Sequence, residues 1–372
     1  MKLFFSPRTD LECVAQALGQ MSVEPGLRGI LMLTAEGNHY DLAQLDALLQ
    51  HSPIPIFGGI FPYVLYEEVQ YSTGVILLGL CCPLQLAVLP QQRLQDEDIS
   101  RYLPPLPRLA GEQRAMLLTF IDGFGHRIHP LIQELFNHYG LELNYIGGGC
   151  GSLSMESGPC VITPQGVLQD AAVLVLCQAA SGIGVAHGWE SISGAFKVTA
   201  SQEGLLQGLD WMPAWTVYQE VVEQHAGVRI SEENFFEIAK AYPLGIAKLG
   251  SELVIRDPVR LQGDALLCVG EVRKGAYVHV MHGGTNTIIQ AARHARDMAV
   301  RELGQADAEI MLFVNCVSRS LFLGAEFHRE LQAVSLPGTP MIGALTLGEI
   351  ANSGRDYLEF FNKTSVVGLI KS

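Results

Sequence analysis

The chain has 372 residues, of which 48% are hydrophobic and 17% are charged, a composition typical of a well-buried globular protein. This length allows two or more domains or one large sheet-based body. The net charge of -14 at pH 7 argues against nucleic acid as a partner, because phosphate contacts need clustered Lys and Arg.

The N-terminal apolar run, in MKLFFSPRTD, is too short for a signal peptide. The most apolar stretch, residues 74–90, is interrupted by Gly79, Pro83 and Gln85, which favours two buried strands over a membrane span. The eight cysteines include no C-x-x-C pattern and most lie in apolar segments, as expected for reduced thiols. We therefore expect a cytoplasmic protein with no membrane span.

One pattern of strand, helix, glycine-ended strand, loop and strand recurs along the chain. The first copy runs from RGILMLTAEG through PIFGGIF to GVILLGL, and the second runs from RAMLLTFIDG through NYIGGGC to AAVLVL. The third copy, near the C-terminus, contains EIMLFVNCVS, PMIGALTLGEI and SVVGLI. These three units predict an α/β (or α+β) fold with mixed β-sheets and packed helices.

The segments between the units indicate where domains meet. A linker rich in Pro and charge is predicted at about residues 90–112, and a helix is predicted between an N-cap at Asp210 and Gly227. Short strands follow, with turns at Gly263-Asp264 and Lys274-Gly275, and then a helix at residues 288–303. We place the domain boundary so that residues 1–228 and 229–372 form two domains, the first with possible sub-units 1–90 and 112–228.

Several blocks of sequence resemble one known family. The segment VAHGWESISGAFKVTASQEGLLQGLDWMPAWTVYQ resembles the end of the FIST N domain. YPLGIAK, VIRDPV, MLFVNCVSRSLFLG, MIGALTLGEI and FNKTSVV resemble successive blocks of the FIST C domain, so the resemblance covers about residues 26–369. It implies a stand-alone, intracellular sensory or signal-transduction module that binds small ligands such as amino acids. We find no kinase, receiver, cyclase or F-box segment, so the output pathway is open.

Two residues of the third unit are candidates for ligand contact because they place charge beside apolar strands. Glu349 must be paired or face a cleft, and Arg319 matches a basic position of the family. The two could pair with each other, pinning the strand ends, or hold a ligand between them. Cys316 lies three residues before Arg319, whose charge could activate its thiol, but core packing is the preferred interpretation of this cysteine.

Further candidates come from two turns and one loop. His187 and Trp189 flank a glycine, and they could form a pocket wall or a turn packed on the core. Arg256 could supply a guanidinium fork for a carboxylate or form a local salt bridge. Asn362 lies in the FNKTSVV block and completes the set.

We therefore expect His187, Trp189, Arg256, Arg319, Glu349, Asn362 and Cys316 to contact an amino-acid-like or other anionic metabolite in a pocket between the two domains. We expect no cofactor, no metal and no catalytic residue, and a signalling protein is a possible partner. Two alternatives stay open. One is an enzyme that uses Cys316, His187 or Glu349, and the other is a protein-interaction scaffold.

Overall fold

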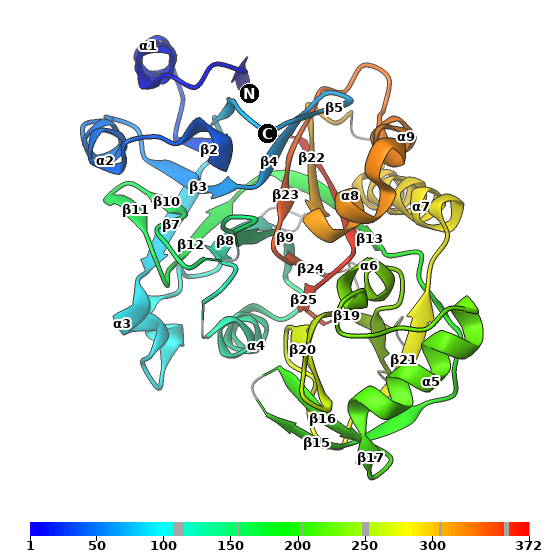
Figure 1. The fold of residues 1–372 in the computed structure, drawn as a ribbon. Helices are drawn as coiled ribbons and strands as arrows, with labels where there is room; N and C mark the ends of the chain where they lie inside the picture. The colour runs from blue at the N-terminus through cyan, green and yellow to red at the C-terminus, as the bar shows by residue number, and fades with distance from the viewer. Residues whose placement is uncertain are drawn as a thin grey trace.

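The protein is built from three sheets with the same strand order and a fourth sheet inserted into the third unit (Figure 1). The computed structural model describes residues 1–107, 115–125, 127–154, 156–202, 204–247, 253–304, 307–352 and 357–371. Within these residues the mixed sheets and packed helices confirm the predicted α/β fold.

The three units have the following elements. Unit 1 contains β1 (Lys2–Ser6), α1 (Leu11–Ser22), β2 (Gly29–Ala35), α2 (Leu42–Gln50), β3 (Ile56–Phe61), β4 (Tyr63–Tyr66), β5 (Val69–Tyr71) and β6 (Val75–Leu80). Unit 2 contains β7 (Leu84–Leu89), α3 (Gln91–Leu94), β8 (Ala115–Asp122), α4 (Ile128–Tyr139), β9 (Leu143–Cys150), β10 (Val161–Thr163), β11 (Gly166–Leu168) and β12 (Ala172–Cys177). Unit 3 contains β13 (Ala180–Ala186), α7 (Thr285–Leu303), β22 (Ile310–Cys316), α8 (Val317–Leu323), α9 (Phe327–Val334), β23 (Met341–Thr346), β24 (Glu349–Ala351), β25 (Glu359–Phe361) and β26 (Ser365–Lys371).

The predicted repeat is confirmed at the level of strand pairing. In each unit the first two repeat strands are parallel neighbours, namely β2–β3, β8–β9 and β22–β23. The last strand of each unit returns antiparallel to the first, as β6, β12 and β26. A leading strand, β1, β7 or β13, then adds to the outer edge of that returning strand.

Each unit also gives a strand to a neighbouring unit. β4 of unit 1 pairs with β23 of unit 3, and β24 of unit 3 pairs with β9 of unit 2. β10 of unit 2 pairs with β3 of unit 1, which closes the exchange into a ring of three. Every six-stranded sheet is therefore completed by strands from another unit.

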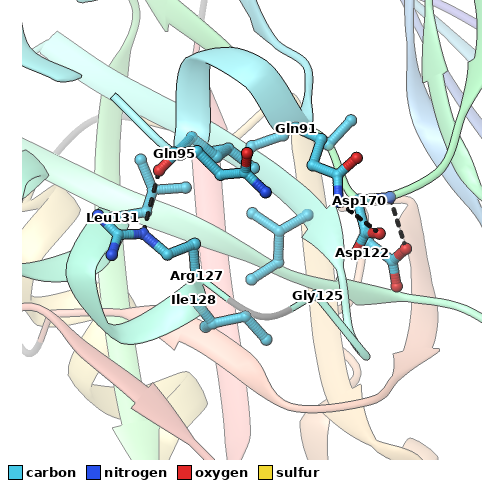
Figure 2. A pocket seen from close by; sticks show the side chains of 12 residues that line it. Gln91, Gln95, Asp122, Gly125, Arg127, Ile128, Leu131 and Asp170 are labelled. Carbon is cyan, nitrogen blue, oxygen red and sulfur yellow. Dashed lines mark hydrogen bonds between the residues drawn. The ribbon is translucent and has the colours of Figure 1, made fainter. Parts of the chain in front are cut away.

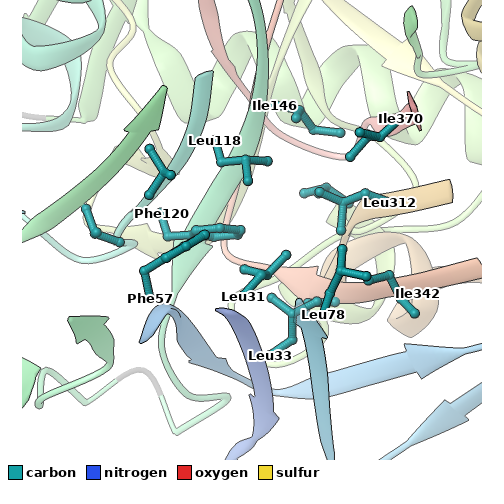
Figure 3. Packing of buried hydrophobic residues seen from close by; sticks show 14 of the residues in the cluster. Leu31, Leu33, Phe57, Leu78, Leu118, Phe120, Ile146, Leu312, Ile342 and Ile370 are labelled. Atoms are coloured by element: carbon teal, nitrogen blue, oxygen red, sulfur yellow. The ribbon is translucent and has the colours of Figure 1, made fainter. Parts of the chain in front are cut away.

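The three units share one hydrophobic core. Figure 3 shows Leu31 and Phe57 from unit 1, Phe120 from unit 2, and Leu312 and Ile342 from unit 3 among the side chains of this cluster. All of them are fully or almost fully removed from water. Burial of apolar area at about 25 cal/mol per Å² makes this shared interior the main source of cohesion between the units.

Glycines on the second strands are required by close approach to the neighbouring strand. In each unit a glycine lies opposite a residue of the first strand and faces its carbonyl oxygen, as Gly58 with Met32, Gly147 with Thr119, and Gly343 with Phe313. A Cβ atom on Gly147 would lie 1.7 Å from the Thr119 oxygen. The glycines predicted at the ends of these strands therefore make the same close contact with the neighbouring strand in all three units.

The fourth sheet lies between β13 and α7 in the chain. It contains β14 (Glu190–Ser191), β15 (Phe196–Gln202), β16 (Leu205–Leu209), β17 (Met212–Pro213), β18 (Leu244–Ile246), β19 (Val254–Gln262), β20 (Ala265–Val269) and β21 (Tyr277–His282). β18 pairs with both β19 and β21, so the sheet closes on itself. Helices α5 (Ala214–Ala226) and α6 (Phe235–Ala239) pack their apolar residues on this sheet (Figure 1).

The local predictions around this sheet have mixed outcomes. The helix predicted at residues 288–303 is confirmed as α7, and the predicted turns at Gly263 and Lys274 are present. The N-cap prediction at Asp210 is wrong, because this residue lies in the turn between β16 and β17 with a positive φ of 46°, and Pro213 precedes the helix instead. The boundary at residue 228 stays a prediction.

The predicted linker begins with α3 and a 3-10 turn at Ile99–Tyr102, and its residues 108–112 lie outside the described residues.

In the described ranges, no helix has both the length and the apolar character needed to cross a membrane.

A substitution tests the glycine contact. Gly147→Ala should lower the free energy of unfolding by about 2–3 kcal/mol or more, because its methyl group must displace the β8 backbone. Gly19→Ala in α1 is the matched control, since nothing lies within 4 Å of its added Cβ and alanine favours helix. Urea unfolding of both variants checks the prediction, which fails if the two are equally stable.

Candidate functional site

The loop between β25 and β26 joins the turns that the sequence singled out. Lys363 in this loop is fully buried, and its φ of 51° is unusual for a residue other than glycine. Its ammonium group forms a salt bridge with Asp257 at 3.1 Å and donates to the Lys240 carbonyl at 2.9 Å. The Lys363 carbonyl accepts hydrogen bonds from Trp189 Nε1 and Arg319 Nη1, both at 3.1 Å.

Arg319, on α8, is also completely buried and uses all five of its N–H donors within the protein. Nε and Nη2 donate to Glu330 Oε1 at 2.9 and 2.7 Å. Nη1 donates to the carbonyls of His187 at 2.6 Å and Lys363, and Nη2 donates to the Ile288 carbonyl at 2.8 Å. Its donors are therefore saturated, and none is left for a ligand.

The predicted pair between Arg319 and Glu349 is wrong, because Glu330 on α9 takes the position of the acid. Glu349 instead accepts hydrogen bonds from Thr346 Oγ1 at 2.9 Å and from the Thr364 backbone at 3.2 Å. Burial raises its pKa to about 8, so the carboxyl group is mostly protonated at neutral pH.

We name the group of Arg319, Glu330, Lys363, Asp257 and Glu349 the Lys363 hub. With Glu349 protonated, two cations face two carboxylates, so the hub is close to neutral overall. Buried charges are tolerated when they are paired in this way, and removing one partner leaves a strongly destabilising charge.

Cys316 and Asn362 lie beside the hub and are also buried. Cys316 ends β22 with 3% of its surface exposed, and burial followed by the charge of Glu349 raises the pKa of its thiol far above the ordinary range. Such a thiol is a poor nucleophile, which removes the sequence argument that Arg319 activates it. Asn362 accepts a hydrogen bond from Thr364 through its backbone carbonyl.

Arg256, on β19, is in a different situation. It is 3% exposed, and it lines a cavity of about 690 Å³ between α4, β18 and β19. Nε donates to the Glu271 carbonyl at 3.1 Å, and Nη1 donates to the carbonyls of Ile255 and Phe360 at 2.9 and 3.0 Å. Across the described part of the chain, Nη2 has no hydrogen-bond partner and no carboxylate is paired with this guanidinium.

The charge of Arg256 persists despite its burial. Desolvation lowers its pKa to about 10, which still leaves it protonated at neutral pH. Gly270, with a φ of 82°, lies against the guanidinium, and a Cβ there would be 2.9 Å from Nε. The backbone is therefore shaped to hold this side chain in place.

The rest of the cavity wall, which we name the Arg256 cavity, is mixed in character. His129 Nε2 accepts a hydrogen bond from the Glu271 backbone at 3.0 Å, which ties α4 to the segment after β20. The Glu271 carboxylate pairs with Arg273 at 3.0 Å. The polar and apolar lining also includes Gln133, Phe136, Asn137, Tyr357 and Glu359.

Two other hollows involve residues of interest. His187 and Trp189 line a groove of about 480 Å³ with the first turns of α7, and this groove shares no lining residue with the Arg256 cavity. A smaller pocket, drawn in Figure 2, lies between Asp122 and Arg127. It holds only about 30 Å³, enough for roughly one water.

His187 is neutral and structural in this arrangement. Its Nδ1 accepts a hydrogen bond from the Trp189 backbone at 2.9 Å, and its carbonyl binds Arg319. Burial and the nearby guanidinium lower its pKa to about 4. Trp189 is 3% exposed, and its ring contacts Phe322 and the Lys363 ammonium.

The sequence candidates are thus divided between three places. Arg256 lines the large cavity, His187 and Trp189 line the groove, and the remaining four are buried in or beside the hub. Sequence reasoning missed Lys363 and Glu330. Both had a detectable signal, since Lys363 is a charge between two apolar strands, and Glu330 shares the apolar helix face of Phe327 and Val334.

In the ranges that the structure describes, no group of three or more His, Cys, Asp or Glu side chains is placed to hold a metal ion.

Comparison with known proteins gives two family matches. Residues 29–212 match the FIST N domain, and residues 214–352 match the FIST C domain. A search of curated proteins found no match for the chain.

Removing the hub arginine tests whether it is structural. Arg319→Met should lower the free energy of unfolding by about 3–5 kcal/mol, because Glu330 is left buried without its partner. The double variant Arg319→Met/Glu330→Leu should recover much of this loss. Thermal unfolding of both variants checks the prediction, and wild-type stability in the single variant would contradict it.

A second test uses the pH dependence of Glu349. Between its ordinary pKa of 4.5 and about 8, the native carboxyl group keeps a proton that the unfolded chain has lost. This group therefore makes the free energy of unfolding fall as pH rises through that window, by up to about 1.4 kcal/mol per pH unit. Glu349→Gln mimics the protonated form and should lack this decline. Parallel pH-stability curves for the two proteins would show that Glu349 ionises normally.

Proposed function

The chain belongs to the FIST family, and on this premise we propose that it is a sensory module that binds a small amino-acid-like or other anionic metabolite in the Arg256 cavity. FIST domains are generally associated with sensory signal transduction. The cavity supports a ligand-binding role because its size falls in the range of small-molecule sites and it contains a few placed polar groups.

The buried guanidinium of Arg256 is the observation that carries the proposal. Three of its N–H groups are held by backbone carbonyls, which fix its position without neutralising its charge. Glu271 attracts this charge from a distance, but no described carboxylate contacts it; a ligand carboxylate would offset the cost of burial through charge-assisted hydrogen bonds to Nη2. Arg319 is equally buried, but all five of its N–H donors are already used within the protein, so it has none to offer a ligand.

The remaining lining favours a zwitterion over a polyanion. The carboxylates of Glu271 and Glu359 and a second cation, Arg273, line the wall, and this mixture of charges suits a ligand that carries both an ammonium and a carboxylate group. The rings of Phe136 and Tyr357, 5.0 Å apart, offer an apolar surface for a side chain. An amino acid combines these three features in one small molecule.

The location of the cavity is also suited to signalling. One wall is α4, from the predicted N-terminal domain, and the other is β18 and β19, from the predicted C-terminal domain. A ligand that contacts both walls would stabilise their approach, and it can bias a conformational equilibrium only through such differential contacts. A signalling protein would then read this arrangement.

The catalytic alternative has less support. The thiol of Cys316 is buried with a raised pKa, and burial lowers the pKa of His187 to about 4. Neither residue lines the Arg256 cavity.

The experiment is a calorimetric and thermal-shift screen of the whole chain against the common amino acids, small dicarboxylates and phosphate esters. For any ligand found, Arg256→Lys should weaken binding about 10- to 100-fold, because lysine keeps the charge but loses the fork geometry. Arg329→Lys is the matched control, since Arg329 on α9 is exposed and pairs with Glu326 in the turn before this helix.

Circular dichroism must show that Arg256→Lys keeps the native fold for the comparison to count. Gly270→Ala provides a second route, because it displaces the guanidinium while leaving its charge in place. Equal affinity in wild type and Arg256→Lys would place the ligand elsewhere, and the groove of His187 and Trp189 would then be the next site to test.

A further inference from the structure

Two thiols meet where the chain crosses between sheets. Cys82 lies in the connection from β6 of unit 1 to β7 of unit 2, and Cys177 ends β12 just before the chain passes to β13 of unit 3. The backbone N–H of Gln178 donates to the Pro83 carbonyl at 2.9 Å, which holds the two connections side by side. Cys177 is the register partner of Leu84, two residues after Cys82, and both thiols are free and belong to the core cluster that the three units share.

The surroundings of the pair distinguish the two sulfurs. Cys177 is fully buried in the shared core, whereas Cys82 has 6% of its surface exposed and follows the exposed Cys81. The hydrogen bond between the thiols lowers the pKa of Cys82 and raises that of Cys177. Cys82 is therefore the sulfur that a reactant from solvent reaches first, and Cys177 lies behind it in the core.

We propose that Cys82 and Cys177 form a reversible disulfide when the protein meets a peroxide. The Cys82 thiolate attacks one peroxide oxygen, breaks the O–O bond and becomes a sulfenic acid, while the leaving oxygen takes a proton to give water or an alcohol. The Cys177 sulfur then attacks the Cys82 sulfur, and the departing hydroxide takes the Cys177 proton and leaves as water. The two thiols are oxidised by two electrons, and the peroxide is reduced by the same two.

The disulfide would add a covalent cross-link between two connections that are far apart in the sequence. It would join the connection between units 1 and 2 to the connection between units 2 and 3, at the core that all three units share. A cross-link that closes so long a loop restricts the unfolded chain strongly. This redox response is independent of ligand binding in the Arg256 cavity.

The experiment treats the reduced full-length chain with hydrogen peroxide, alkylates the remaining thiols after denaturation and identifies the peptides by mass spectrometry without reduction. We expect a peptide that links Cys82 to Cys177, its loss with dithiothreitol, and a melting temperature several degrees higher in the oxidised protein. Cys81→Ser should keep the cross-link, and Cys177→Ser should accumulate sulfenic acid at Cys82, which dimedone traps.

The other thiols serve as internal controls. Burial raises the pKa of Cys150, Cys160 and Cys268 as it does that of Cys177, but Cys177 alone among these four interacts with the Cys82 thiol, so the other three should stay available for alkylation. Oxidation confined to Cys81, or a bond between Cys81 and Cys82, would overturn the proposal. Because the wild-type protein gives the decisive result, the conclusion does not depend on whether a cysteine variant folds.

Discussion

The exchange of strands between the three units is the constraint on which the rest of the structure depends. Each unit has a parallel pair of strands whose close contact requires a glycine, and each sheet is completed by strands from a neighbour. A unit by itself would therefore leave an open sheet edge and an exposed apolar face. The shared core can form only when all three units are present, so we expect them to fold as one cooperative body.

This arrangement explains why so many charged groups are buried in unit 3. The fourth sheet is inserted between β13 and α7, so its strand β19 must be held in a fixed position against the three units. The Lys363 hub provides this joint, because Lys363 pairs with Asp257 on β19 while its carbonyl accepts hydrogen bonds from Trp189 and Arg319. Directed hydrogen bonds specify one orientation between the parts, which apolar packing alone does less well.

The sequence revealed the repeats because their signals are local. Buried strands, glycine at strand ends and helical spacing are all properties of short segments, and they predicted the three units and α7. The pairing of β24 with β9 depends on residues about 200 positions apart, which no local pattern encodes. The same limit explains the wrong partner for Arg319, since the choice between Glu330 and Glu349 is decided by how α9 packs. Arg256 was found as an isolated charge, but its cavity required α4 from the other half of the chain.

The two buried arginines show why burial alone does not identify a binding residue. Arg319 and Arg256 have nearly the same exposure, and both are held by backbone carbonyls. They differ in their acidic partners, because Glu330 forms a direct ion pair with Arg319, whereas no described carboxylate contacts Arg256. The first arrangement is complete and stabilises the fold. The second is complete only when a negative group enters the cavity, and so the protein retains at Arg256 a preference for an anion that its own side chains do not satisfy.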